Sequence, residues 1–336
     1  MPFDLSRQEI SGQALPLPES VLTKPGGAAL FGISRSGTLA YISGEIPRRE
    51  RELVWVDRSG REAPVSAPRR TYWYPRISPD GRRVALDVRD QQNDIWIWDF
   101  SLEKLDRFTF EPGFDSYPVW TPDGRRIAFS SSGSLFWRPA DGSGAPERLA
   151  QAPVEQQPYA FTPDASQLVV RGPGISVVSV STGTYKTVLT GAVNAEFSSD
   201  GRWLAYDSTE PGGRHVFVRP FPATDKGRWQ VSTAGGVMPV WTRNGRELLY
   251  VSPQNDLVSV AIRPGDQFQF GSPAVVLKNV INPDVSVGRS YDVAPDGQRF
   301  LFIRDKSEAD AANRDLAIGI VLNWQQGLKA RLPSDK

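Results

Sequence analysis

The sequence predicts an all-β fold built from repeated units of four antiparallel strands. A short turn motif, most often Pro-Asp-Gly after Ser or Thr, occurs seven times, and each copy joins two runs of alternating large hydrophobic residues. Successive copies end 44, 43, 41, 36, 44 and 52 residues apart. This spacing is close to the period of about 40–45 residues that is typical of four-stranded propeller blades. We therefore expect a β-propeller of seven blades, with six or eight blades as the alternatives.

Each motif has the residues that a tight turn between two strands needs. Proline presets φ for the second turn position, Asp or Asn accepts backbone hydrogen bonds, and Gly adopts the left-handed conformation. The carboxylates lie on separate blades, so we assign them to turns rather than to catalysis or metal binding. The turn residues are Gly37, Asp80, Gly81, Asp123, Gly124, Asp164, Asp200, Gly201, Gly245, Asp296 and Gly297.

A third and a fourth strand follow each hairpin. Segments 53–58 and 94–99 are examples of the third strand, and 185–189 is an example of the fourth. Side chains alternate between the two faces of a strand, so large residues two positions apart reach the same face of a blade. Trp120, Trp241 and their counterparts Phe161 and Phe197 are accordingly predicted to be core residues between blades.

The repeats predict a single propeller domain over residues 1–336, with a half-blade over 1–21, repeated blades over 22–330 and a tail over 331–336. The last unit has a hairpin at Gly297 and a predicted third strand over 316–324, but its fourth strand is poorly marked. Residues 1–21 could supply ring-closing strands and so remove exposed sheet edges. Equally, a region upstream of Met1 could complete the half-blade. The charged segment 304–315 is expected to be a loop between strands.

Composition excludes several classes of function. The 39 Lys and Arg residues nearly balance 38 Asp and Glu residues, so the chain lacks the basic field on which nucleic-acid binding depends. It contains no cysteine, and therefore has no disulfide or thiolate chemistry. Residues 1–7 lack the basic start and long apolar stretch that are typical of a signal peptide, and no later run approaches about 18 apolar residues. We expect a soluble monomer with no membrane segment in this chain, and its compartment stays open.

The motifs of the common propeller-linked enzymes are missing from the chain. The one histidine, His215, lies in a predicted strand, and no Gly-x-Ser-x-Gly nucleophile elbow is present. A serine hydrolase needs both that elbow and a histidine partner, and a single histidine cannot form the usual His-rich zinc site. We therefore expect no catalytic residues, no metal and no cofactor.

A binding module is the leading interpretation, because propeller loops can vary around the channel without disturbing the blades. The connections that enter the innermost strands are expected to share one face, together with those between second and third strands. A flat scaffold for a partner protein is the other interpretation, and the sequence does not identify a ligand. The candidate ligand-binding residues are Trp73, Asp115, Tyr117, Gln157, Asn194, Glu210 and Arg289.

Several segments, in their order along the chain, resemble a known group of proteins. They are 55–60, 77–85, 94–99, 107–110, 216–222 and 322–324. Together they are similar to TolB-like, WD-repeat-like propellers, and more narrowly to the C-terminal propeller regions of bacterial serine/threonine protein kinases. The resemblance implies a non-catalytic sensory or scaffold module, held outside the cytoplasm behind a kinase domain and a membrane helix. His215 departs from the carboxylate that such relatives carry nearby. The alternative is the cap domain of a prolyl-oligopeptidase-like serine hydrolase whose catalytic domain is absent from this chain.

Overall fold

The structure is a computed structural model that divides the chain into two units. It describes residues 3–4, 9–10, 21–22, 29–43, 50–90, 92–150, 155–280, 288–305, 317–324 and 326. One unit comprises Met1–Arg48 and Ser307–Lys336, and the other comprises Arg49–Lys306. Among the described residues, no helix has the length and apolar character needed to cross a membrane.

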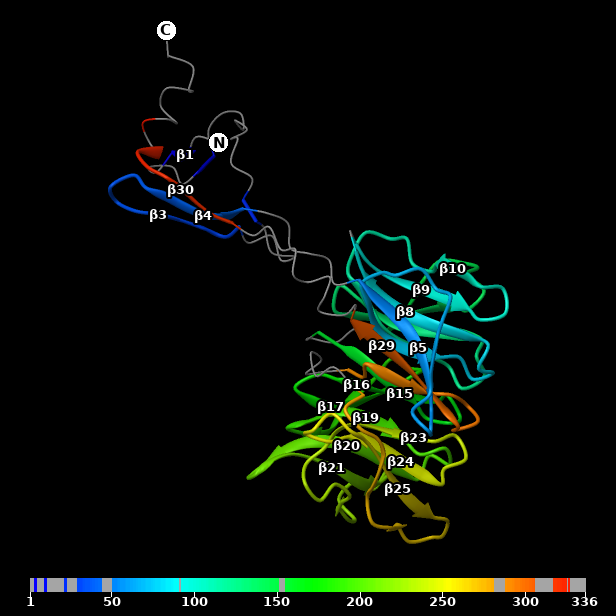
Figure 1. Cartoon of the computed structure of the whole chain (residues 1–336). Helices are drawn as coiled ribbons and strands as arrows, with labels where there is room; N and C mark the ends of the chain where they lie inside the picture. Colours follow the sequence, from blue (N-terminus) through cyan, green and yellow to red (C-terminus); the bar gives the residue numbers. More distant parts are fainter. Residues whose placement is uncertain are drawn as a thin grey trace. The chain divides into compact units, whose positions relative to one another are not determined.

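The described strands of the unit Arg49–Lys306 form six antiparallel sheets, which we number as blades 1 to 6 (Figure 1). Blade 1 has β7 (Tyr72–Ile77), β8 (Arg83–Arg89), β9 (Asn93–Asp99) and β10 (Lys104–Arg107). Blade 2 has β11 (Asp115–Trp120), β12 (Arg126–Ser131), β13 (Ser134–Pro139) and β14 (Glu147–Ala150). Blade 3 has β15 (Gln157–Phe161), β16 (Gln167–Arg171), β17 (Gly174–Ser179) and β18 (Tyr185–Thr190).

The remaining three blades continue the same order of strands. Blade 4 has β19 (Ala192–Phe197), β20 (Trp203–Glu210), β21 (Gly213–Pro220) and β22 (Trp229–Gln230). Blade 5 has β23 (Val237–Trp241), β24 (Glu247–Val251) and β25 (Leu257–Arg263), and both β26 (Gln269–Phe270) and β27 (Ala274–Leu277) pair with β25. Blade 6 has β28 (Tyr291–Val293), β29 (Arg299–Asp305), β5 (Arg51–Asp57) and β6 (Glu62–Pro64).

Six clusters of buried hydrophobic residues join each blade to the next, including blade 6 to blade 1, so the blades form a closed ring. Blade 6 shows how strand alternation produces this packing. In β29, Phe300 and Phe302 face the cluster shared with blade 5, while Leu301 and Ile303 face the cluster shared with blade 1. Every blade therefore buries both of its faces, which is the requirement of a repeat architecture.

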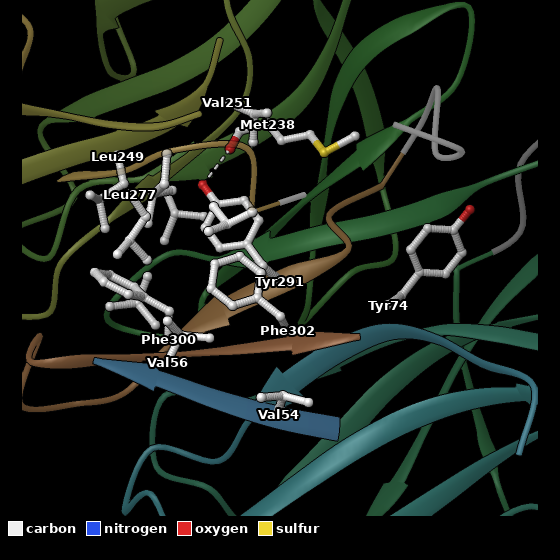
Figure 2. Close-up of a cluster of buried hydrophobic side chains, with 14 residues drawn as sticks. Val54, Val56, Tyr74, Met238, Leu249, Val251, Leu277, Tyr291, Phe300 and Phe302 are labelled. Atoms are coloured by element: carbon white, nitrogen blue, oxygen red, sulfur yellow. Dashed lines mark hydrogen bonds between the residues drawn. The ribbon is translucent and has the colours of Figure 1, made fainter. Parts of the chain in front are cut away.

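Figure 2 shows the cluster between blades 5 and 6. Tyr291 lies at its centre and donates its hydroxyl to the carbonyl oxygen of Met238 at 3.0 Å, so the hydroxyl of this buried ring is hydrogen-bonded. Phe302 stacks on Tyr291 with ring centroids 6.0 Å apart. Val54 and Val56 of β5 complete the cluster from the N-terminal part of the chain.

Ring closure differs from the sequence-based expectation. The third strand of the last repeat is β5, which pairs with β29 over seven residues from Arg299↔Asp57 to Asp305↔Arg51. The segment expected there, 316–324, instead contains β30 (Ala317–Val321), which pairs with β4 (Leu39–Ser43). Consequently the described strands of the ring lie between Arg51 and Asp305. In the other five blades the third strand follows its hairpin along the chain, whereas in blade 6 the third strand, β5, precedes the hairpin of β28 and β29. Order along the chain therefore does not identify the third strand of this blade.

The described strands of the other unit form two small sheets. One pairs β1 (Phe3–Asp4) with β2 (Glu9–Ile10), and the other has the order β3 (Phe31–Ile33), β4, β30. Gly37 has a φ of 83° in the turn between β3 and β4, as the motif requires. The remainder of the expected half-blade over 1–21 and the expected tail over 331–336 lie outside the described residues.

The prediction of an all-β propeller with four-stranded antiparallel blades is confirmed. The described strands form seven sheets of three or more strands, which fits about seven repeat units. Six of these sheets constitute the closed ring, and the seventh belongs to the unit that contains both ends of the chain.

The turn assignment is also supported by hydrogen bonds that recur from blade to blade. In blade 2, the Thr121 hydroxyl donates to Asp123 at 2.6 Å, and the Arg125 amide donates to the same carboxylate oxygen at 3.0 Å. Gly124 follows with a φ of 69°. In blade 5, Asn244 accepts the equivalent bonds from Thr242 and Arg246.

We predict that Trp120→Ala lowers the free energy of unfolding by about 3–5 kcal/mol, as other large-to-small core changes do. Trp120 packs between blades 1 and 2, and its indole Nε1 donates to the carbonyl oxygen of Arg76 at 2.8 Å. Denaturant titration measures the change, and Phe110→Ala at an exposed ring is the control. A melting temperature within about 1 °C of the parent would contradict the core assignment.

We predict that Asp123→Asn keeps the turn but removes part of the acid sensitivity of the fold. The Thr121 hydroxyl and the Arg125 amide lower the pKa of Asp123 below its ordinary value. A lowered pKa stabilises the fold above pH 3.8, and this stabilisation is lost as pH falls through the lower folded value. Asp123→Asn should therefore approach the parent's stability in acid, whereas Asp123→Ala loses two hydrogen bonds of about 0.5–1.5 kcal/mol each at every pH. Melting curves from neutral to acidic pH would show whether the parent and Asp123→Asn converge.

Candidate functional site

The central channel of the ring contains a cavity of about 360 Å³. It lies at the end of the channel where the innermost strands run into the Pro-Asp-Gly turns. All six blades contribute to its walls, and the turn residues Pro79, Pro122, Pro163, Ser199 and Arg243 line it as well.

The walls of the cavity are formed by one repeat position from every blade. This position is the large hydrophobic residue immediately before the turn, and each of its six side chains is between 5% and 8% exposed. The residues are Ile77, Trp120, Phe161, Phe197, Trp241 and Val293. The predicted core assignment of the aromatic members therefore holds, and the same side chains also present a small area to the channel.

Charged residues enter the cavity from three blades, one position earlier in the strand. Blades 1, 4 and 6 place Arg76, Glu196 and Asp292 there, whereas blades 2, 3 and 5 place small apolar residues: Val119, Ala160 and Val240. The repeat thus provides an apolar channel, and three blades depart from it with ionisable groups.

Arg289 connects the two carboxylates of this group. Its Nη1 donates to Glu196 at 3.1 Å and its Nη2 to Asp292 at 2.8 Å, while its Nε donates to the Tyr291 carbonyl oxygen at 3.1 Å. The second oxygen of Asp292 accepts the Ile77 amide at 2.7 Å, which ties blade 6 to blade 1. Both carboxylates are therefore already hydrogen-bonded within the protein.

Burial shifts the pKa values of these groups. Burial raises the pKa of Glu196, and the charges of Arg289 and Arg76 oppose that rise. For Arg289, burial lowers the pKa, but Asp292 and Glu196 outweigh this effect and the net shift is upward. Because Glu196 and Asp292 are held close to Arg289, the three residues act as one paired cluster.

Arg76 is different, because no salt bridge in the described part of the chain includes it. Its side chain is buried, with 8% of the residue exposed, and Nη1 donates to the carbonyl oxygens of Pro75 and Arg289 at 2.8 and 3.3 Å. The Nε atom is buried without a hydrogen-bond partner. Burial, followed by the charge of Arg289, lowers the pKa of Arg76 to about 10, so the guanidinium remains charged at neutral pH.

Two of the seven predicted site residues lie at these cavities. Arg289 lines the main cavity, and both Arg289 and Asn194 line a narrow neighbouring cavity of about 10 Å³. Asn194 donates to Asp207 at 2.8 Å and accepts the Gly288 amide at 2.9 Å. Asn194 is thus held by the protein itself.

Trp73 and Tyr117 come together around Tyr74. The rings of Tyr74 and Tyr117 stack with centroids 4.4 Å apart, and Trp73 lies 5.9 Å from Tyr74. Arg51 covers the Trp73 ring at 4.1 Å. These partly buried aromatic residues lie near the starts of innermost strands, as expected, but they do not line either cavity.

The other three candidates are not brought to a common site. Asp115 is buried, and its Oδ1 lacks a hydrogen-bond partner. Gln157 accepts from Arg171 at 3.2 Å, and Glu210 pairs with Arg228 at the end of the β20–β21 hairpin. Their role in binding remains a prediction.

A repeated β-bulge explains the geometry near the strand starts. The register of β7, β11, β19 and β23 shifts at this point, and Tyr74, Tyr117, Asn194 and Met238 have φ values between 46° and 57°. The buried carboxylate of Asp207 accepts the Met238 amide at 3.0 Å and so stabilises the bulge of the next blade. Strained backbone often marks a functional site, but here its repetition in successive blades indicates a structural device.

Sequence reasoning missed Arg76, Glu196 and Asp292. A signal was available, because all three are charged residues at a repeat position where the other blades have Val or Ala. His215, predicted as a strand residue, lies in β21, where Gln230 and Ser232 contact its Nδ1 atom. No group of three or more His, Asp or Glu side chains suited to a metal ion occurs within the ranges that the structure describes.

Solved structures with the same fold include TolB proteins. A protein assigned as TolB from Agrobacterium tumefaciens superposes with a TM-score of 0.60 at 14% identity, covering 77% of this chain and 99% of that one. TolB from Acinetobacter baumannii gives 0.50 at 17% identity, covering 70% and 68%. A chain of the Mitotic Checkpoint Complex also gives 0.50, at 14% identity, covering 89% and 99%. At these identities the likeness shows the fold alone.

Two curated proteins match part of the sequence. The uncharacterised peptidase YuxL of Bacillus subtilis (strain 168) is 26% identical over 185 residues, which are 50% of this chain and 27% of YuxL. The uncharacterised protein Atu1656 of Agrobacterium fabrum (strain C58 / ATCC 33970) is 31% identical over 159 residues, 44% of this chain and 52% of that protein. The matches thus span about a quarter and about half the length of these relatives. No family model matches the chain.

We predict that Arg289→Ala lowers the free energy of unfolding by about 3–5 kcal/mol, because it leaves the buried carboxylate of Asp292 and the partly buried carboxylate of Glu196 without their partner. This differs from the behaviour expected of a surface site, for which the melting temperature would be nearly unchanged. Trp73→Ala and Tyr117→Ala provide the comparison near the strand starts. Denaturant titration of the three variants measures their free energies of unfolding. A value for Arg289→Ala equal to that of the parent would contradict the paired cluster.

Proposed function

We propose that the propeller is a non-catalytic binding module and that its ligand, a small molecule or a segment of a protein, enters the channel from the Pro-Asp-Gly end. The observation that carries the proposal is the composition of the 360 Å³ cavity. Its apolar walls follow the repeat of the fold, but charged residues replace the repeat in three blades. The same position is apolar in blades 2, 3 and 5, so the repeat itself does not require a charge there, and buried charge is unfavourable unless it is paired. Concave apolar sites with a few placed polar groups are typical of ligand binding.

Several polar groups of the cavity are already hydrogen-bonded within the protein, and this favours binding over catalysis. The hydroxyls of Thr121, Ser198 and Thr242 each donate to the Asp or Asn of their own turn at 2.6–2.8 Å. Glu196 and Asp292 accept from Arg289. A nucleophile needs a base within hydrogen-bond reach, and these hydroxyls are bonded to turn residues instead.

For the whole protein, we propose that this propeller is the ligand-binding or docking region of a receptor-like bacterial serine/threonine kinase. The resemblance of segments such as 55–60 and 94–99 to kinase-linked propellers supports this proposal, and it would place the ring outside the cytoplasm. The coding sequence upstream of Met1 tests it. An in-frame kinase domain followed by a membrane helix is the expected result, and a stop codon close to Met1 would contradict it.

The second candidate is a cap domain next to a peptidase domain. It is favoured by one observation, the 26% identity over 185 residues with the peptidase YuxL. Here the coding sequence downstream is decisive, because the candidate requires an in-frame domain with a Gly-x-Ser-x-Gly elbow and a histidine. In both cases the propeller itself would bind rather than catalyse.

We predict that Ser199→Phe blocks ligand entry without unfolding the ring, because Ser199 is an exposed turn residue that lines the cavity. A fragment library is screened by ¹⁹F NMR on protein labelled with fluorotryptophan, in which Trp120 and Trp241 report on the cavity. Fragments that shift both resonances in the parent should shift neither in Ser199→Phe.

Arg35→Phe is the matched control, because Arg35 occupies the same motif position in the turn between β3 and β4, which belongs to the other unit. It should leave the response of Trp120 and Trp241 unchanged. Shifts confined to other tryptophans, or equal shifts in Ser199→Phe and the parent, would contradict binding in the channel.

A further inference from the structure

One buried guanidinium group in the wall of the cavity, that of Arg76, forms no salt bridge with a described residue. Arg289, Arg76 and Arg243 supply three cationic groups to its walls, and Glu196 and Asp292 supply two anionic groups. Arg289 makes salt bridges to both carboxylates. Arg76 makes none among the described residues, although it is the more deeply placed of the two remaining cations: Arg243 is exposed in a turn and reaches only the Ser78 carbonyl oxygen, at 3.5 Å.

One edge of the Arg76 guanidinium is unused. All of its hydrogen bonds to described residues come from Nη1, and they go to the carbonyl oxygens of Pro75 and Arg289. Nε is buried without a partner, and Nη2 has no hydrogen bond to any described residue. Nε and Nη2 together form the planar fork that arginine uses for bidentate contacts with carboxylates. Arg76 lines the cavity, so an acceptor that reaches this edge would satisfy donors that the described residues leave unused.

We propose that Arg76 anchors the carboxylate of a ligand whose apolar body packs between the aromatic walls of the channel. This inference rests on the proposed binding function of the cavity and names its ligand class. Trp120 and Trp241, with Phe161 and Phe197, form the surface for the apolar body. The carboxylate could belong to a small organic acid or to the C-terminus of a peptide, since both present the same group.

The surroundings of Arg76 favour a single negative charge over a phosphate group. Glu196 and Asp292 line the same cavity, so a doubly charged ligand would meet two like charges at short range. A monoanion would complete the charge balance of the cavity, with three positive and three negative groups. Arg243 at the turn would attract the anion during its approach, as exposed charges do for ligands in solution.

The test compares acids with their amides, so that only the charge of the ligand changes. The small probes are indole-3-propionate and indole-3-propionamide. The peptide probes are one tripeptide ending in Trp, with either a free or an amidated C-terminus. Titrations followed through the fluorinated Trp120 and Trp241 should show that at least one acid binds about 10–100-fold more tightly than its amide, the range expected for hydrogen bonds to a charged group. The arm with the larger ratio identifies the source, and inorganic phosphate should not compete.

Arg76→Met should abolish the preference for the acid, so that the acid and its amide bind with equal affinity. Arg76→Lys retains the charge but not the planar fork, so it should show a reduced preference for the acid. If Arg76→Met fails to fold, an unreduced preference in Arg76→Lys would contradict the assignment. Arg138→Met is the matched control. Arg138 is also buried, donates to the carbonyl oxygens of Phe108, Gly142 and Gly144, and does not line the cavity. A folded Arg138→Met protein should retain the full preference.

The outcomes separate this inference from the proposed function. If acid and amide bind equally and Ser199→Phe abolishes both, the channel binds ligands but the carboxylate inference is wrong. If the preference persists in Arg76→Met, or if no acid binds at millimolar concentrations, the assignment to Arg76 is also overturned. If probes bind but Ser199→Phe has no effect on either member of a pair, binding in the channel itself is contradicted.

Discussion

The pairing of β5 with β29 is the constraint on which the rest of the ring depends. It joins residues 51–57 to residues 299–305 in a continuous seven-residue ladder. A blade cannot bury both of its faces alone, so an open arrangement would expose two apolar surfaces and two sheet edges. The ladder removes both problems at once, because β5 adds Val54 and Val56 to one cluster and Leu53 to the next. The loop-closure entropy of joining such distant segments is offset by these contacts.

Closure of the ring also creates the channel. Six copies of one turn converge only because six blades surround a common axis. As a result, the residue immediately before each turn lies beside the cavity. Local environment shifts the pKa values of carboxylates in the turns and in the innermost strands in opposite directions. In the turns, hydroxyl and amide donors lower the pKa of Asp123, whereas burial in the channel raises the pKa of Glu196. Carboxylates at repeat positions only a few residues apart thus have different roles. Those in the turns accept turn hydrogen bonds, and those in the innermost strands contribute charge to the cavity.

The two ends of the innermost strands have different roles. Near their starts, bulges recur in successive blades and are held by buried side chains such as Asp207, which accepts from Asn194 and from Met238 of the next blade. Near their ends, charged residues replace the small apolar residue of the repeat in three blades. Departure from the repeat is the better indicator of a binding site, because a feature that every blade shares is explained by the fold.

The sequence by itself determined the strand-rich blades, the turns and the aromatic cores, because these depend on local conformational preference and on the alternation of side chains over a few residues. It could not determine which third strand joins the last hairpin: 316–324 and 51–57 have similar hydrophobic patterns, and only the packing of complete blades selects between them. The same holds for the site. Arg289 and Asn194 lie at the cavities and their role in binding stays a prediction, whereas Arg76, Glu196 and Asp292 become a group only when blades 1, 4 and 6 meet around the channel. Tertiary structure decided the pairing of their charges, because a salt bridge depends on distance in space and not on position in the repeat.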